Sequence, residues 1–403
     1  MKFDIFCEIQ RAFPWRGADE ASLFSEILAQ ARACDEAGFE IWWQVEHHGA
    51  PQFSYSAAPE VVLTAIAMAT QRLRVGHAGV LAPFKINHPL KAAERGATLD
   101  ILSNGRFELG LAKSGGKEWE TFGVDPKTAR DEVREAMHMI PRMWTQDEFS
   151  WKSELIEVPA REVVPRPLQK PHPRLWQTCG SPESFRMAGE MGVGALGTTL
   201  LSPIAFLGSM LEEHRAGLAA LPDQAGVDVN REAGVFTFVH LADSRERAIA
   251  NGAAWSALWY VNAAPIIFKV PRAVWYDMIK AGLHPNSAQA TAATDRDPTG
   301  LEIEPGDPDV LVLLKRMANG ETIDFAEAHE VLEGLDCVII GDPDHCAAKV
   351  KGYEAIGADR LMCLMQFGSI PHREILRSIE LTGEHLIAAA PAERARAGAL
   401  AGT

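Results

Sequence analysis

The chain has 403 residues, of which 47% are hydrophobic and 23% are charged, an ordinary balance for a folded globular protein. Its formal net charge is -15, from 39 basic and 54 acidic residues, so its average surface repels nucleic acids and anionic membranes and disfavours both as partners. Six cysteines lie far apart without a CxxC pair, an acid stands early in the N-terminus and no apolar run reaches membrane-spanning length, so we expect free thiols and a cytoplasmic protein.

Short apolar runs alternate with longer amphipathic patterns along the chain. Strands are expected at 3–9, 40–45, 73–81, 107–112, 174–179, 195–199, 235–241 and 360–365. Helices are expected at 22–37, 59–70, 89–102, 130–144, 182–191, 204–218, 244–259, 344–356 and 371–386. Eight strands that alternate with helices predict an α/β fold, a single (β/α)8 TIM barrel that forms one domain over 1–403.

The chain is longer than such a barrel, which needs about 250 residues, so the surplus must form insertions. One insertion follows the fourth strand and its helix, at 145–172, and its proline and charge content indicates a short hairpin. A longer one follows the seventh strand and its helix, at 261–335, where a lid or binding loop is expected. The alanine-rich tail, 388–403, is expected to be flexible.

Glu46, His47 and His48 follow an apolar run at the C-terminal tip of the second expected strand. Barrel enzymes carry their active sites at this end of the strands, and histidine is the side chain best suited to move protons near neutral pH. The three residues are therefore candidate catalytic groups. The alternatives are a solvated histidine at a strand end or a metal site. Adjacent strand side chains point to opposite faces and no HxH or HxxxH set accompanies them, so we assign no metal ligands.

Ser181 and Ser184 open the helix expected after the fifth strand. Ser181, followed by a proline, is explained fully as a helix cap, but free N–H groups and hydroxyls at a helix start also suit a phosphate. Lys113, just past the fourth strand, and Arg130, at the next helix start, are candidates to supply positive charge to the same phosphate. Taken alone, each cation is more often a solvated surface charge.

The stretch 192–197 matches the dinucleotide-binding pattern GxGxxG. That pattern binds a pyrophosphate only when a strand precedes it and a helix follows it. Here the expected helix comes first and the strand second, so we interpret the stretch as a glycine-rich turn. Electrons for a redox reaction would then come from elsewhere than a bound nicotinamide.

Taken together, the order of motifs resembles the bacterial luciferase-like, flavin-dependent monooxygenases. The resemblance covers most of the chain, and it is carried by the Glu-His-His stretch and by 75–83, 88–94, 99–107, 122–125, 180–184, 258–263 and 340–344. It implies a TIM-like barrel that binds reduced flavin mononucleotide (FMN) at its C-terminal face. The region between Ala263 and Ile339 is longer and different, and Ala112 replaces a cysteine of the luciferase itself. These departures warn against assigning a long-chain aldehyde substrate or light emission.

Individual roles follow from the resemblance by position. It places Lys113, Arg130, Ser181 and Ser184 at the flavin phosphate, and it places a non-proline cis peptide under the flavin ring at Ala78–Gly79. Lys113 stands where the luciferase carries arginine, which puts bidentate phosphate binding there in doubt. His47 matches the proton-transferring histidine, with Glu46 and His48 beside it, and Thr237 and Trp259 match positions near the ring.

The resemblance thus implies a two-component monooxygenase. A separate NAD(P)H:flavin reductase would supply FMNH2, dioxygen would give a flavin C4a-hydroperoxide, and one oxygen atom would pass to a small, hydrophobic organic substrate. A homodimer is expected, with the second and third helices at its seam. A deazaflavin-dependent oxidoreductase, a non-catalytic flavin-binding subunit and a metal-dependent barrel hydrolase remain as alternatives, and the substrate and the bond oxidised stay open.

Overall fold

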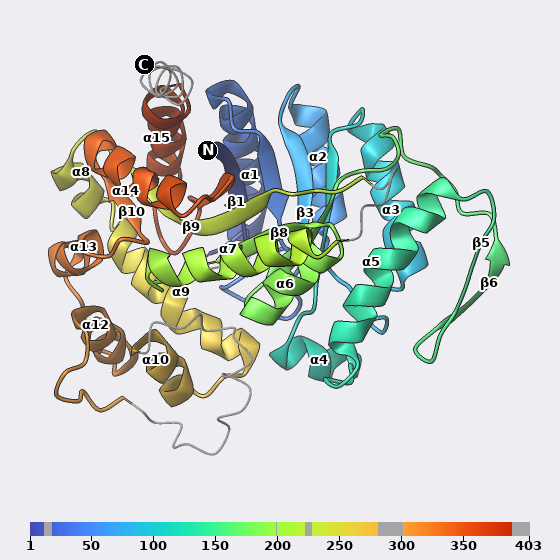
Figure 1. Cartoon of the computed structure of the whole chain (residues 1–403). Helices are drawn as coiled ribbons and strands as arrows, with labels where there is room; N and C mark the ends of the chain where they lie inside the picture. Colours follow the sequence, from blue (N-terminus) through green and yellow to red (C-terminus); the bar gives the residue numbers. More distant parts are fainter. Residues whose placement is uncertain (12–17, 199, 222–227, 281–300, 389–403) are drawn as a thin grey trace, which may run out of the picture.

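The computed structural model describes residues 1–11, 18–198, 200–221, 228–280 and 301–388, and its centre is a closed barrel of eight parallel strands (Figure 1). Each strand pairs with the next, and β9 pairs with both β8 and β11, which closes the ring. The eight strands are β1 (Lys2–Cys7), β2 (Ile41–Gln44), β3 (Arg74–Leu81), β4 (Phe107–Ala112), β7 (Leu175–Cys179), β8 (Gly194–Thr198), β9 (Ala233–Leu241) and β11 (Arg360–Leu364). The predicted TIM barrel is confirmed, and these strands match the expected ones apart from their ends.

Helices surround the barrel because each strand is buried and its apolar side chains need cover on the outside. They are α1 (Ala18–Ala37), α2 (Pro59–Ala69), α3 (Pro89–Leu102), α5 (Ala129–Thr145), α6 (Pro182–Glu190), α7 (Ile204–Ala219), α14 (Pro343–Ala355) and α15 (His372–Thr382), which continues as the π-helical turn η1 (Gly383–Ile387). Among the described residues, no helix combines the length and apolarity that a bilayer crossing requires.

Two local predictions from the sequence hold. All six cysteines are buried and free. Gly192, at φ 69°, lies in the turn after α6 and β8 begins at Gly194, so the stretch that matches GxGxxG is a turn from helix to strand.

The first insertion is the predicted hairpin, whose antiparallel strands β5 (Phe149–Lys152) and β6 (Glu157–Arg161) project from the side of the barrel (Figure 1). The second insertion is largely helical. Its described part includes α10 (Arg272–Lys280), α12 (Asp309–Ala318) and α13 (Phe325–Glu333), and it is followed by the short strand β10 (Ile339–Gly341), which pairs with the end of β9. Residues 281–300 of this insertion, and 389–403 of the expected tail, lie outside the described residues.

Two departures from the expected helices shape the end of the barrel that holds the site. The helix expected at 244–259 is two helices, α8 (Arg245–Ala250) and α9 (Ala253–Phe268), divided at Gly252 in the left-handed conformation. The short helix α4 (Gly116–Phe122) was not predicted. The sequence of α9 is apolar almost all round, so periodicity gave no signal for where it ends.

The N-terminal end of the barrel is closed by a buried charge network. Arg360 is fully buried, and its guanidinium donates to both oxygens of Asp4, at 2.7 and 2.8 Å, and to Glu232 and Glu40. The indole of Trp43 donates to the same Asp4 carboxylate at 2.9 Å, and a Cβ on Gly76 would come within 2.2 Å of that indole ring. This floor leaves the opposite, C-terminal end of the strands for a ligand site.

Candidate functional site

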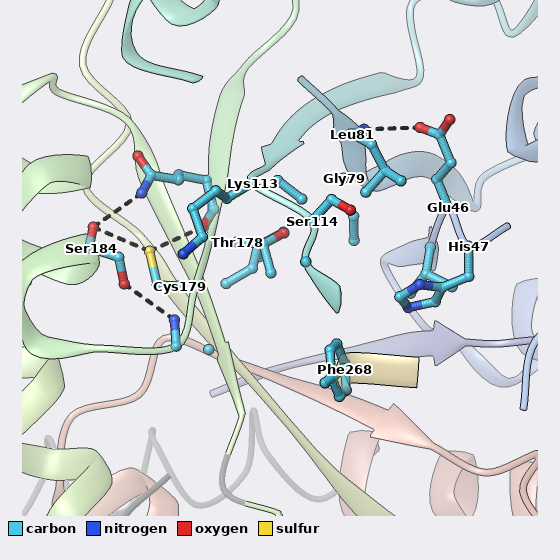
Figure 2. A pocket seen from close by; sticks show the side chains of 18 of the residues that line it. Glu46, His47, Gly79, Leu81, Lys113, Ser114, Thr178, Cys179, Ser184 and Phe268 are labelled. Carbon is cyan, nitrogen blue, oxygen red and sulfur yellow. Dashed lines mark hydrogen bonds between the residues drawn. The ribbon is translucent and has the colours of Figure 1, made fainter. Parts of the chain in front are cut away.

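A cavity of about 330 Å³ opens at the C-terminal end of the barrel, and all but two of the site residues assigned from the sequence either line it or lie beside it (Figure 2). Its walls come from the ends of β1, β2, β3, β4, β7, β8 and β9 and from the connections that follow them. Figure 2 shows Lys113 and Ser184 on one side of the cavity and Glu46 and His47 on the other. The volume falls in the range of small-molecule sites.

His47 lines the cavity and is held between two carboxylates that the sequence analysis did not assign. Its Nδ1 lies 3.1 Å from Glu118 Oε1, and its Nε2 lies 3.8 Å from Glu8 Oε2. Burial alone would lower the pKa of His47, but the carboxylates of Glu8 and Glu118 raise it to about 9. At neutral pH the ring is therefore an imidazolium with a proton on Nε2 available to the cavity.

Glu118 fixes this arrangement from α4. It also accepts hydrogen bonds from the backbone N–H of His48, at 2.9 Å, and from the hydroxyl of Ser114. Burial alone would raise the pKa of Glu118, but the hydrogen bond and charge of His47 lower it, so the group is a carboxylate. Glu8 ends up beside them because β1 and β2 are paired neighbours. A glutamate near the end of the first expected strand, 3–9, was the one signal in the sequence.

Glu46 and His48 form a separate pair. His48 Nε2 lies 3.0 Å from Glu46 Oε1, and Glu46 also accepts from the N–H of Leu81 and from Asn87. Burial alone would raise the pKa of Glu46, but these hydrogen bonds lower it to about 2, and the bond to Glu46 raises the pKa of His48. Glu46 lines both the main cavity and a second cavity between α2 and α3, whereas His48 lines only the second.

The peptide bond between Ala78 and Gly79 is cis, and both residues line the cavity. A Cβ added to Gly79 would lie 2.8 Å from the backbone carbon of Leu111, so β3 and β4 approach here too closely for any side chain. The result is a wall of bare backbone, against which a flat ring system can lie.

Two cations stand at the opposite side of the cavity, near the start of α6. Neither Lys113 nor Arg130 forms an ion pair with a carboxylate in the part of the chain that the structure describes, although both line the cavity. The Lys113 ammonium lies 5.2 Å from the ring centre of Trp119, and burial, with Arg130 nearby, lowers its pKa. Two partly buried cations that lack an ion-pair partner among the described residues, with only the more distant Glu183 carboxylate near Arg130, form a site for an anion.

Ser181 and Ser184 line the same corner and cap α6 reciprocally. Ser184 Oγ accepts from the backbone N–H of Ser181 at 3.0 Å, and Ser181 Oγ accepts from the N–H of Ser184 at 3.4 Å. Their hydroxyls thus already serve the helix start. Gln177, which lines the cavity, donates through Nε2 to the carbonyl of Ser184, and its buried Oε1 has no hydrogen-bond partner among the described residues.

Thr237 and Trp259, assigned by position to the neighbourhood of the ring, do not line the cavity. Thr237 is buried and donates its hydroxyl to the carbonyl of Cys337. Their chain neighbours Phe236 and Tyr260 line it instead. On strand β9 successive side chains point to opposite faces, and on helix α9 successive side chains point in different directions, so a shift of one residue decides which side chain reaches the cavity.

The mouth of the cavity is walled by α4 and by the end of α9. Trp119 comes from α4. Phe268 is the last residue of α9, and Val270 lies two residues beyond it. Outside them, Lys269 and Glu120 form an exposed ion pair between the two elements. The start of the second insertion therefore forms part of the site wall.

A family model described as luciferase-like monooxygenase matches residues 1–360. The oxygenase component of the flavin-dependent trigonelline monooxygenase of Acinetobacter baylyi is 30% identical over 203 residues, which are 50% of this chain and 55% of that protein. The F420-dependent glucose-6-phosphate dehydrogenase of Amycolatopsis mediterranei is 24% identical over 243 residues, 58% of this chain and 70% of that protein. The chain thus spans about half the length of the first of these relatives.

Among solved structures, the chain resembles the oxygenating constituent of the 3,6-diketocamphane monooxygenase of Pseudomonas putida in complex with FMN. The TM-score is 0.68 at 17% sequence identity, and the match covers 96% of this chain and 98% of that one. A likeness at this identity shows a shared fold.

Proposed function

The chain belongs to the luciferase-like monooxygenase family, and from this premise we propose that it is the oxygenase component of a two-component, FMNH2-dependent monooxygenase. A separate NAD(P)H:flavin reductase would supply the reduced flavin, and the substrate would be a small organic molecule with substantial apolar surface. The observation that carries the proposal is the pairing, in one cavity, of two cations that lack an ion-pair partner among the described residues and a histidine held between two carboxylates.

The residues present fit FMN. Lys113 and Arg130 would hold its phosphate, since both lack a carboxylate partner among the described residues and flank the start of α6. The backbone wall at Ala78–Gly79 would take the ring system, and the free Oε1 of Gln177 would accept a hydrogen bond from it. Ser181 and Ser184 support the phosphate proposal through the exposed helix start more than through their hydroxyls.

Reduced flavin, when bound, supplies the electrons that activate dioxygen for transfer of one oxygen atom to the substrate. In this proposal His47 gives a proton from Nε2 to the reacting oxygen, while Glu118 holds Nδ1 and thereby fixes the ring. Glu46 and His48 support the strand end as an ion pair. Trp119, Phe268 and Val270 exclude water from the mouth.

Replacing the two cations tests the cofactor site. We expect Lys113→Met and Arg130→Met each to weaken FMN binding by about tenfold or more, since each removes a charge-assisted contact to the phosphate. Lys117→Met, an exposed lysine on the same segment, is the matched control and should bind FMN as the unmodified protein does. Fluorescence titration of FMN measures all three, and unchanged affinity in both cavity variants would remove the basis of the proposal.

Replacing the histidine tests the chemistry. With reduced FMN regenerated by an added flavin reductase, His47→Asn should lower substrate oxygenation by about 10²-fold or more while FMN affinity stays the same. Oxygen uptake and product analysis across a panel of candidate substrates measure this. Oxygenation by His47→Asn at the unmodified rate would contradict the role of His47.

A deazaflavin-dependent oxidoreductase is the second candidate, because an F420-dependent dehydrogenase is among the relatives. Parallel titrations with FMN and F420 separate the two, and the formation of an oxygenated product with reduced FMN and dioxygen favours the first. A non-catalytic flavin-binding subunit would bind FMN yet show no turnover when assayed alone.

We also propose a homodimer through α2 and α3. Val61 and Met68 of α2 are 70% and 67% exposed, and Ile101 and Leu102 at the end of α3 are exposed as well. An apolar stripe of this kind favours burial against a partner. Light scattering should give twice the chain mass, and Val61→Glu with Met68→Glu should shift it to one chain, whereas a monomer before substitution would refute the assembly.

A further inference from the structure

One part of the cavity differs in chemistry from the phosphate corner. Around His47 the walls are aromatic: the ring of Phe268 lies 6.3 Å from the imidazole, and Tyr260 lines the same space. Phe53 packs behind them, 4.9 Å from Tyr260 and 5.9 Å from His47. We call the space bounded by Glu8, His47, Tyr260 and Phe268 the acidic chamber.

The charges around the acidic chamber do not balance. Glu46 is already neutralised by His48, and Glu118 by its contact with His47. The single imidazolium thus lies between two carboxylates, Glu118 and Glu8, and only Glu118 is within hydrogen-bond distance of it. An ionised Glu8 leaves one negative charge uncompensated.

Glu8 is the group left without a full set of partners. Its side chain is buried, with 3% of the residue exposed, and it lines the cavity. Oε1 accepts a hydrogen bond from the Tyr260 hydroxyl at 3.3 Å, whereas Oε2 has no hydrogen-bond partner among the described residues. Burial raises the pKa of this carboxyl, the nearby imidazolium of His47 opposes that rise, and a further positive charge in the cavity would favour the carboxylate still more.

Aromatic faces and a buried carboxylate are the two features by which proteins recognise organic cations. The π-face attracts a cation that is shielded from water, and the carboxylate supplies the counter-charge. The overall charge of -15 adds a long-range attraction for cations. Beside a neutral apolar substrate, the buried Glu8 carboxylate would have only the imidazolium of His47 as counter-charge, and it shares that imidazolium with Glu118.

We propose that the substrate is an organic cation, with a quaternary or protonated nitrogen that lies against Tyr260 and Phe268 and is paired with the carboxylate of Glu8. This inference rests on the proposed monooxygenase function and specifies its substrate class. It assigns Glu8 the role of a specificity-determining residue.

Two probes of the same shape test the inference. One is the cation of nicotinamide methylated on its ring nitrogen, and the other is meta-toluamide, in which a carbon replaces that nitrogen. We expect the FMN-loaded protein to bind the cation more tightly, and Glu8→Gln to lower the ratio of the two affinities by about tenfold or more. Glu120→Gln, which removes an exposed carboxylate outside the cavity, is the control and should leave the ratio unchanged.

Calorimetry with both probes, and FMN titration of each variant, keep the two proposals distinguishable. If FMN binds but the neutral probe binds as tightly as the cation, or if Glu8→Gln leaves the ratio unchanged, the substrate class is wrong and the monooxygenase proposal stands. If FMN does not bind, the proposed function itself fails. Normal FMN affinity in Glu8→Gln shows that the variant has folded.

Discussion

At the scale of single residues, the site depends on how carboxylates set the charge of His47. Its pKa of about 9 lies above the ordinary value of 6.5, so protonation stabilises the folded state. That contribution is fully present below pH 6.5 and is lost as the pH rises from 6.5 through about 9. A histidine in this environment is suited to donating a proton at neutral pH, and much less suited to accepting one.

Glu118→Gln should lower the pKa of His47 by about one unit or more, because a hydrogen-bonded carboxylate is replaced by a neutral amide. Titration of the ring by NMR measures this directly, and the basic limb of the oxygenation rate should move to lower pH by the same amount. Glu120→Gln serves as the control because its carboxylate lies outside the cavity. If the pKa of His47 were the same in the variant, Glu8 alone would be responsible for raising it.

At the scale of elements, the barrel floor joins strands that are remote in sequence. Arg360 begins β11, Asp4 belongs to β1, Glu40 precedes β2 and Glu232 precedes β9. One buried guanidinium therefore holds together the starts of four strands. Removing it leaves the buried carboxylate of Asp4 without a counter-charge.

Arg360→Met should destabilise the protein by about 3–5 kcal/mol, the usual cost of breaking a buried ion pair from one side. Arg377→Met, which removes an exposed ion pair with Asp243, should cost no more than about 1 kcal/mol. Urea unfolding at one pH compares the two variants. If the two variants lost the same free energy of unfolding, the buried network around Arg360 would contribute no more to stability than an exposed ion pair does.

The amino-acid sequence was sufficient to predict the barrel, since apolar runs that alternate with helical patterns identified all eight strands. It also placed Glu46, His47, Lys113 and Arg130 at the C-terminal end of that barrel, where the structure has all four lining one cavity. It did not find Glu118, because α4 is too short to give a periodic pattern. Nor did it bring Glu8 to His47, since that contact depends on side-chain directions across β1 and β2.

At the scale of the whole molecule, stability should fall on both sides of neutrality, for opposite reasons. His240 is fully buried, and burial lowers its pKa to about 4, with Glu374 and His329 nearby. Between pH 6.5 and about 4, His240 therefore binds a proton in the unfolded chain but not in the folded chain. Stability from this group is lost as the pH falls from 6.5 towards 4, whereas that from His47 is lost as the pH rises.

Acid unfolding tests this pH dependence. The free energy of unfolding should decrease between pH 6.5 and 4, by up to about 3 kcal/mol from His240 alone. His240→Phe should flatten that acid limb while it leaves the decline above pH 6.5 in place. If the variant keeps the full acid dependence, other buried histidines such as His77 and His214 must carry it.

The stacking of Lys113 over Trp119 gives the molecule an optical reporter of its own. The ammonium lies 5.2 Å from the indole centre, and the indole emits light whose colour and yield depend on nearby charge. An anion that draws the ammonium away would change this emission even if the anion were colourless. Binding of inorganic phosphate, which neither absorbs nor fluoresces in this range, would then change the tryptophan fluorescence of the protein. In a Trp119→Phe protein the same binding would not produce this change.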